Sequence, residues 1–360
     1  MIYYSMLMAF VFGMGALKND RINARDDEPI WKFAFVLLVF FIGFRHHVGM
    51  DWNNYLAQFE RVKGEHFSQV FDYTEWLYYL TMHIANYLGF DIHVANLISS
   101  TVFCIGLFAF CNSLPNRWAG LLAALPLCVF TFAMSANRQA MAAGILLYLV
   151  AHWYQYGVFR RLVFIGLASL CHTSAMLMTL FVILELRKSV YIKLGLAAAL
   201  FAAAYLSAET MDRFEYYDKL YGLRGGDDQR KVVEASGALA HLLFNAGPGL
   251  MIVISWLRGG WARGLNRLLL CMALFSVALI PGAMVASTAI SRISMYLFPV
   301  SVCFFGCIPI WAKTKSSSQF VYLGAGVFLI AVAVFWFYFS NSGFAYINYS
   351  NYLFISSETE

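Results

Sequence analysis

The sequence predicts an all-α protein that crosses a membrane many times. Of its 360 residues, 61% are hydrophobic and only 12% are charged, against about 25% charged in an ordinary soluble domain. The apolar residues gather in runs that approach the ~20 residues of a membrane-spanning helix. A soluble domain could not bury so much apolar surface. We therefore expect one membrane domain, and not two or three soluble domains.

The apolar runs follow one another along nearly the whole chain. The first covers residues 1–17 and lacks a basic n-region and a cleavage site, so we interpret it as a retained helix. Further runs cover residues 31–44, 93–111, 118–134, 139–156, 158–186, 190–206, 238–257, 266–286, 293–311 and 319–340. Residues 75–89 are short and polar for a span. Residues 158–186 are long and could form one tilted helix, or two short helices that turn near His172.

The distribution of Lys and Arg favours one arrangement of these runs. If residues 75–89 stay outside and residues 158–186 cross twice, 15 of the 25 basic residues lie inside. If the orientation of residues 90–172 in the membrane is reversed, only 13 lie inside. The first arrangement has about twelve crossings with both chain ends outside. We expect residues 1–340 to form a single membrane domain, and residues 341–360 a short outer tail.

Two outer loops are long in this arrangement. Residues 45–74 follow the second apolar run, and residues 207–236 follow the run at 190–206. The first half of the second loop has aromatic and charged residues at near-helical spacing, which is typical of an interfacial helix.

Composition and motifs argue against several other classes of protein. The seven cysteines lie in apolar runs, where they act as small hydrophobic residues. Cys303 and Cys307 have no nearby histidine or carboxylate, and the pair His46-His47 with Asp51 lacks a further spaced ligand, so we predict no metal and no cofactor. The net charge of +5 is too dispersed for nucleic-acid binding. The common hydrolase, metalloprotease, P-loop and CxxC motifs do not occur.

Ionisable residues at the ends of membrane spans are costly to place and are therefore functional candidates. The strongest group is the run R-H-H-V-G-M-D-W-N-N-Y, which contains Arg45 and Asp51. Gly49 would let the chain turn sharply there. The alternative is an interfacial anchor, in which Arg45 reaches the headgroups and Trp52 and Tyr55 join the aromatic belt.

Three further residues stand out from apolar surroundings. Arg138 lies between two apolar runs, His172 lies inside one, and Arg292 opens another. Each has an ordinary alternative: a charge at a helix start, or a histidine that hydrogen-bonds between packed helices. If Arg45, Arg138 and Arg292 converge, their guanidinium groups could bind a diphosphate. Because no DxD or ExD pair occurs on the outer side, the arginines would replace a divalent metal.

At these residues the sequence resembles the EpsG family of exopolysaccharide polymerases, a branch of the Wzy-type repeat-unit polymerases. The matching elements are R-x-x-V-G-x-D-x-x-x-Y (Arg45 to Tyr55), Glu75 at the start of an apolar segment, N-R-Q (Asn137 to Gln139), H-x-S-A (His172 to Ala175), R-x-x-x-Y (Arg292 to Tyr296), and an aromatic stretch at Tyr349. The sequence departs from the family pattern at Met50, at Trp52 and in the paired histidines. These departures concern the acceptor sugar more than the class.

The resemblance implies a GT-C-like glycosyltransferase of the bacterial inner membrane with its active site facing the periplasm. Such a polymerase joins oligosaccharide repeat units carried on undecaprenyl diphosphate into exopolysaccharide, capsule or O-antigen. The lipid-linked oligosaccharide would be both donor and acceptor, and a chain-length regulator and a flippase would act beside it.

Other readings come from different classes. A flippase or transporter for lipid-linked sugars should show inverted repeats and broken helices. A membrane acyltransferase would use a catalytic histidine, an O-antigen-type ligase would use the same donor, and a structural scaffold would need none of these motifs.

The polymerase reading assigns roles to nine residues. Arg45, Arg138 and Arg292 would stabilise the diphosphate leaving group, and Tyr55, Gln139 and Tyr349 would hold sugar hydroxyls. Asp51 is the preferred base for the attacking hydroxyl, with Glu75 and His172 as alternatives. Because neighbouring arginines would lower the pKa of an exposed Asp51, this role requires its partial burial, or His172 in its place.

Overall fold

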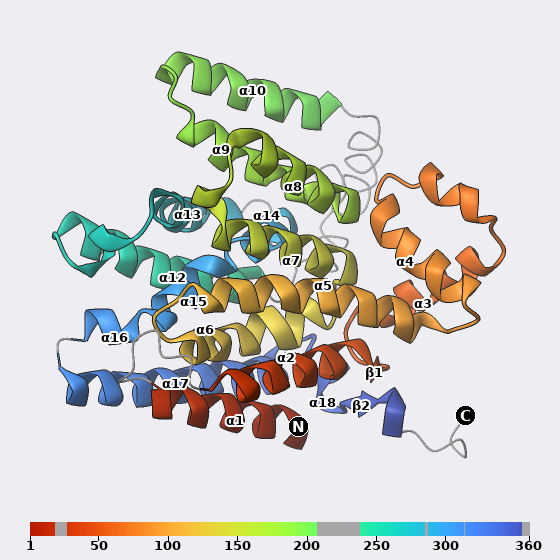
Figure 1. The fold of residues 1–360 in the computed structure, drawn as a ribbon, viewed down its shortest axis with the longest axis horizontal. Coiled ribbons are helices and arrows are strands. Elements are labelled where there is room, and N and C mark those ends of the chain that lie inside the picture. The colour runs from red at the N-terminus through yellow and green to blue at the C-terminus, as the bar shows by residue number, and fades with distance from the viewer. Residues whose placement is uncertain (19–26, 207–237, 285–286, 313, 355–360) are drawn as a thin grey trace.

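The computed structural model describes residues 1–18, 27–206, 238–284, 287–312 and 314–354. It consists almost entirely of helices, and many of them run along the long axis of the molecule (Figure 1). The expected outer loop at 207–236 lies outside the described residues, so its interfacial helix stays a prediction.

The elements have these bounds in chain order. The first half holds α1 (Ile2–Lys18), α2 (Glu28–Gly43), β1 (Arg45–His46), α3 (Trp52–Lys63), η1 (Phe67–Asp72), α4 (Trp76–Tyr87), α5 (Ile92–Asn112), α6 (Arg117–Ala124), η2 (Leu125–Ala133), α7 (Asn137–Ala151), η3 (Trp153–Gln155), α8 (Val158–Cys171), η4 (Thr173–Met178) and α9 (Thr179–Glu185). The second half holds α10 (Val190–Leu206), α12 (Ala238–Leu257), η6 (Trp261–Gly264), α13 (Arg267–Ala278), η7 (Pro281–Met284), α14 (Ser287–Met295), α15 (Phe298–Gly306), α16 (Ile308–Trp311), α17 (Lys315–Phe339), α18 (Phe344–Ile347), β2 (Ser350–Asn351) and η8 (Tyr352–Phe354).

Helix length and apolarity agree with a helical membrane protein. Within the described ranges, three stretches are long and apolar enough to cross a bilayer: Ile92–Asn112, Leu239–Leu257 and Ser316–Phe339. Several shorter apolar helices of 10–17 residues accompany them. The coarse prediction of an apolar helical bundle is therefore confirmed, and the number of about twelve crossings stays a prediction.

The ambiguous run at 158–186 forms two short helical segments. Helix α8 ends where His172 adopts an extended backbone, with φ −157° and ψ 119°, and the chain continues through η4 into α9. Nη1 of Arg161, near the start of α8, lies 2.8 Å from Oε2 of Glu185, at the end of α9. Because these two ends meet, the chain reverses near His172, as the second of the two alternatives predicted.

The two ends of the bundle hold different groups of predicted residues. Arg117, expected inside, is buried at one end and forms ion pairs with Asp27 (2.6 Å) and Glu28 (2.9 Å). The opposite end carries both strands, α3, α4 and the N-terminus (Figure 1). There the amino group of Met1 donates to the carbonyl of Ile347 at 3.1 Å. The N-terminus and the described part of the C-terminal segment thus lie at the end that carries the residues expected outside.

The C-terminal segment, expected to be a short tail from residue 341, packs onto the bundle over its described part. Strand β2 pairs antiparallel with β1, so that Arg45 lies opposite Asn351. Tyr346 is buried and donates to the carbonyl of Thr131 at 3.1 Å. Residues 341–354 are therefore part of the folded body and cover the end of η2.

The segment η2 is a π-helix that leads directly to one of the predicted site residues. All nine of its residues are buried, and Pro126 stands near its start. The helix ends at Ala133 with Met134 as its C-cap residue, and α7 begins at Asn137 after a short break. The break places Arg138 in the first turn of α7. A π-helix directly before a predicted site residue fits the frequent occurrence of π-helical turns at functional sites.

Candidate active site

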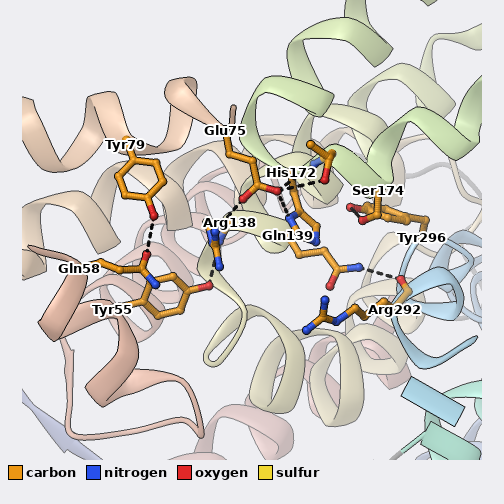
Figure 2. Close-up of polar contacts among 11 residues, drawn as sticks. Tyr55, Gln58, Glu75, Tyr79, Arg138, Gln139, His172, Ser174, Arg292 and Tyr296 are labelled. Atoms are coloured by element: carbon orange, nitrogen blue, oxygen red, sulfur yellow. Dashed lines mark hydrogen bonds and ion pairs between the residues drawn. The ribbon is translucent and has the colours of Figure 1, made fainter. Parts of the chain in front are cut away.

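Glu75 lies at the centre of a polar cluster that joins three distant segments (Figure 2). Its Oε2 accepts a 2.8 Å hydrogen bond from Nη1 of Arg138, and its Oε1 lies 2.6 Å from Nδ1 of His172. The backbone N–H and the hydroxyl of Thr173 also donate to Oε1, at 3.1 and 3.3 Å. The start of α4, the first turn of α7 and the break after α8 are therefore tied together by one carboxylate.

The hydrogen bond to Glu75 sets the chemistry of His172. An ionised carboxylate only accepts hydrogen bonds, so Nδ1 of His172 carries a proton and donates it to Oε1. In the neutral imidazole, Nε2 is then the nitrogen with a free lone pair. The His172 side chain is 10% exposed, whereas Glu75 is 2% exposed. The pair is thus a histidine held by a buried carboxylate, with its second nitrogen available to accept a proton.

The electrostatics of Glu75 make it a poor base. Burial by itself raises the pKa of this carboxyl, but the hydrogen bond from His172, the charge that His172 carries when protonated, the charge of Arg138 and the Thr173 N–H together lower it to about 2. Glu75 is therefore ionised at neutral pH and holds its partners in place. Of the alternatives for the base, His172 fits the geometry better than Glu75.

Asp51 precedes α3 at the same end of the bundle. Its Oδ2 lies 3.4 Å from the hydroxyl of Ser135, which also accepts from the Asp51 backbone N–H at 3.3 Å. Burial raises the pKa of Asp51, and the charges of Arg292 and Arg138 partly offset this effect. Both arginines therefore lie close enough to act on the Asp51 carboxylate, which has the partial burial expected of a base.

Two of the three predicted arginines have guanidinium groups at the site. The Arg138 side chain is 29% exposed, and the residue Arg292 is exposed. Nε2 of Gln139 donates to the backbone carbonyl of Arg292 at 2.7 Å, which ties α14 to α7. Figure 2 shows the Arg292 side chain extending from α14 towards the side where Gln139 and Arg138 lie.

Arg45, the third arginine, is placed differently. It is 1% exposed, and each of its three guanidinium nitrogens donates to a protein acceptor. Nε donates to the carbonyl of Met134 at 2.8 Å, Nη1 to the carbonyl of Ile42 at 2.7 Å, and Nη2 to the side-chain oxygen of Asn137. The expected convergence of three arginines therefore reduces to Arg138 and Arg292, because Arg45 has no exposed surface to offer a ligand.

Of the three residues expected to bind sugar, two lie in the Glu75 cluster and one lies elsewhere. Tyr55 is buried beside Arg138, and its hydroxyl accepts from the Arg138 backbone N–H at 3.4 Å. Gln139 belongs to the cluster but uses its amide on Arg292. Tyr349 stacks on Phe41 with ring centroids 4.3 Å apart and donates to the Phe41 carbonyl at 2.8 Å. Tyr349 thus packs the C-terminal segment against α2, and a sugar-binding role is no longer assigned to it.

Several polar residues of the cluster received no role from the sequence. The hydroxyls of Ser174 and Tyr296 lie 3.0 Å apart, and Tyr79 donates to Oε1 of Gln58 at 3.3 Å (Figure 2). Ser174 and Tyr296 belong to the H-x-S-A and R-x-x-x-Y motifs, which could have identified them. Tyr79 and Gln58 carry no such signal, since they are ordinary residues of short helices.

The described ranges show no arrangement suited to a metal ion. They contain no group of three or more His, Cys, Asp or Glu side chains positioned to hold one. His46 faces His93, with Nδ1 3.2 Å from Nε2 of that ring. The absence of a cofactor stays a prediction.

The comparison with protein families covers the whole of this site. The model of the EpsG family matches residues 30–352, nearly the entire chain. The matched range includes Asp51, Glu75, Arg138, His172 and Arg292, which the fold brings to one end of the bundle. Neither a search of curated proteins nor a search of solved structures returned a match. A family match over this much of the sequence places the protein: it belongs to the EpsG family.

Proposed function

We propose that this protein polymerises oligosaccharide repeat units carried on undecaprenyl diphosphate at the periplasmic face of the bacterial inner membrane. Membership of the EpsG family supports a polysaccharide polymerase-type membrane protein. One observation carries the finer proposal: the Glu75 carboxylate bonds both Arg138 and His172. Arg138, a cation that can bind a diphosphate, and His172, a base that can accept a hydroxyl proton, are thus both held by Glu75.

The leaving group requires positive charge and not a proton. Arg138 and Arg292 supply it, because guanidinium groups make paired hydrogen bonds to phosphate oxygens and stay charged. Only one Arg138 nitrogen is engaged by Glu75, and its buried Nε has no hydrogen-bond partner among the described residues. These two arginines would stabilise the charge that develops on the diphosphate, without a divalent metal.

The attacking hydroxyl requires a base, which we assign to Nε2 of His172. The oxygen of the acceptor hydroxyl bonds to the anomeric carbon as the bond from that carbon to the diphosphate oxygen breaks. The hydroxyl proton passes to Nε2, and Glu75 stabilises the imidazolium through Nδ1. A single displacement of this kind inverts the anomeric centre. Asp51 then orients the arginines, and Tyr55 and Gln139 line the site.

The membrane arrangement belongs to the same proposal. We propose a GT-C-like bundle with about twelve crossings and the Glu75 cluster on the periplasmic side. The excess of Lys and Arg expected inside supports this orientation. Burial of Arg117 at the opposite end agrees with it, since that residue belongs to the expected inner set.

The proposal is tested by incubating purified protein with a synthetic lipid-diphosphate repeat unit, with and without EDTA, and resolving the products on a ladder gel. A ladder that persists in EDTA supports a metal-independent polymerase, whereas one lost in EDTA rejects the arginine mechanism. No ladder, with movement of the lipid across vesicles, would indicate a flippase. Transfer only to a different lipid acceptor would indicate an O-antigen-type ligase.

A further inference from the structure

We infer that Arg45 is a positioning residue that holds the first turn of α7 and thereby aims Arg138 at the site. This inference rests on the proposed function, because it concerns the same Arg138. It gives Arg45 a role that requires no contact with substrate. The evidence is the set of acceptors that surround this buried cation.

The first acceptor lies at the end of the π-helix. The last carbonyls of a helix have no partner within the helix and carry partial negative charge. Nε of Arg45 donates to one of them, the carbonyl of Met134, at 2.8 Å. Nη1 donates to the carbonyl of Ile42, near the end of α2. Arg45 therefore joins the ends of two helices that are far apart in the sequence.

The second contact fixes the residue next to Arg138. The side-chain oxygen of Asn137 accepts from Nη2 of Arg45, and its Nδ2 donates to the side chain of Asn96 at 2.6 Å. The backbone carbonyl of Asn137 accepts from the hydroxyl of Ser99 at 3.0 Å. Asn137, the first residue of α7, is thus held between Arg45 and α5. The direction in which Arg138 leaves the backbone follows from this placement.

Gly49 lies close to the same carbonyl. Its φ is +102°, and a Cβ atom at this position would lie 2.1 Å from the carbonyl oxygen of Met134. Its N–H donates to the carbonyl of Ala345 at 3.0 Å, which anchors the turn to the C-terminal segment. Arg45 and Gly49, four residues apart in one motif, therefore both adjoin the Met134 carbonyl.

Lysine should not replace Arg45 in this role. The three acceptors of Arg45 belong to three segments and each takes a different guanidinium nitrogen. An ammonium group is a single point charge at the end of a flexible chain and cannot reproduce the planar fork. Arg45→Lys therefore keeps the positive charge but loses the three guanidinium hydrogen bonds. The variant thus distinguishes a positioning role of Arg45 from a purely electrostatic one.

The test measures the reactivity of Arg138 and needs no substrate. Purified full-length protein is treated with phenylglyoxal, which modifies accessible guanidinium groups, and modification is quantified by mass spectrometry. Arg45→Lys should increase the modification of Arg138 several-fold and leave that of the exposed Arg292 unchanged. Arg117→Lys is the matched control, a buried arginine at the opposite end of the bundle, and should change neither. Equal Arg138 reactivity in wild type and Arg45→Lys would overturn the inference.

A second variant covers the case in which Arg45→Lys fails to fold. Gly49→Ala should push the Met134 carbonyl and raise the reactivity of Arg138 in the same way. Gly89→Ala is its control, because Gly89 also has a positive φ of +75° but nothing lies within 4 Å of an added Cβ. If the two glycine variants give the same Arg138 reactivity, the carbonyl does not transmit the effect.

A binding measurement separates this inference from the proposed function. Geranylgeranyl diphosphate serves as the probe, and its affinity is measured for wild type, Arg45→Lys and Arg117→Lys. We expect weaker binding only in Arg45→Lys, by about tenfold. Unchanged affinity in that variant would contradict the inference. Failure of the wild type to bind would contradict the proposed function, while the phenylglyoxal result would still decide the role of Arg45.

Discussion

Nδ1 of His172 lies 2.6 Å from Oε1 of Glu75, although 97 residues separate the two in the sequence. Because Oε2 of the same carboxylate bonds Arg138, the histidine and the arginine are positioned by one group. The proposed base and the proposed diphosphate ligand should therefore respond together to changes at Glu75, and separately to changes at their own positions.

His172→Gln should lower the polymerisation rate by about 10²–10⁴-fold, the usual contribution of a general base. The amide cannot accept the hydroxyl proton, although it can still bond Glu75. The initial rate of ladder formation from a lipid-linked repeat measures the effect. His152→Ala, at the opposite end of α7, serves as the control and should leave the rate unchanged. A His172→Gln protein with near wild-type rate would exclude His172 as the base.

Glu75→Gln should make the protein less stable by an amount that depends on pH. The pKa of Glu75 falls from 4.5 to about 2 in the folded protein, which corresponds to about 3 kcal/mol of stabilisation. A carboxyl group whose pKa is lower in the folded than in the unfolded protein contributes its full stabilisation of the fold at pH values above its unfolded pKa. This contribution is lost as the pH falls from about 4.5 towards 2.

Thermal unfolding in detergent checks this dependence. The difference in unfolding free energy between wild type and Glu75→Gln should be largest at neutral pH and shrink in acid. A difference that stays constant down to pH of about 3 would show that the Glu75 charge does not stabilise the fold.

Arg138→Lys should raise KM for the lipid-linked donor by about tenfold, because lysine keeps the charge but not the paired hydrogen bonds to phosphate. Arg138→Ala should abolish polymer without loss of protein. Polymer yield and length in cells, together with KM in detergent, measure both effects. Polymer of normal length from Arg138→Ala cells would remove this residue from the site.

Asp51→Asn distinguishes the two remaining assignments of the base. If Asp51 only orients Arg138 and Arg292, the rate should fall by less than about tenfold. The acid side of the rate–pH profile should also stay in place, because ionisation of Asp51 would not limit the rate. Burial raises the pKa of Asp51, so Asp51 as the base would add its own acid limb, and Asp51→Asn would remove it. That outcome would transfer the role of base to Asp51.

Several features of this protein were predictable from the sequence. Apolar runs of near-spanning length require helices, because backbone polar groups in a membrane must bond within their own segment. Ionisable residues are so costly among these runs that Asp51, Arg138, His172 and Arg292 could be singled out, whereas Glu75 was identified only by the family resemblance. The EpsG resemblance carried by their motifs agrees with the family that the chain belongs to.

The tertiary structure decided what these residues touch. Length and hydropathy allowed the run around His172 to be one helix or two, and the pairing of Arg161 with Glu185 shows the reversal. Composition could not reveal that Arg45 would donate a hydrogen bond to the carbonyl of Met134, 89 residues away. In a sequence, every arginine at the end of a span looks equally able to bind a ligand. Hydrogen-bond partners depend on which helix ends the fold brings together, whereas burial of apolar runs depends mainly on composition.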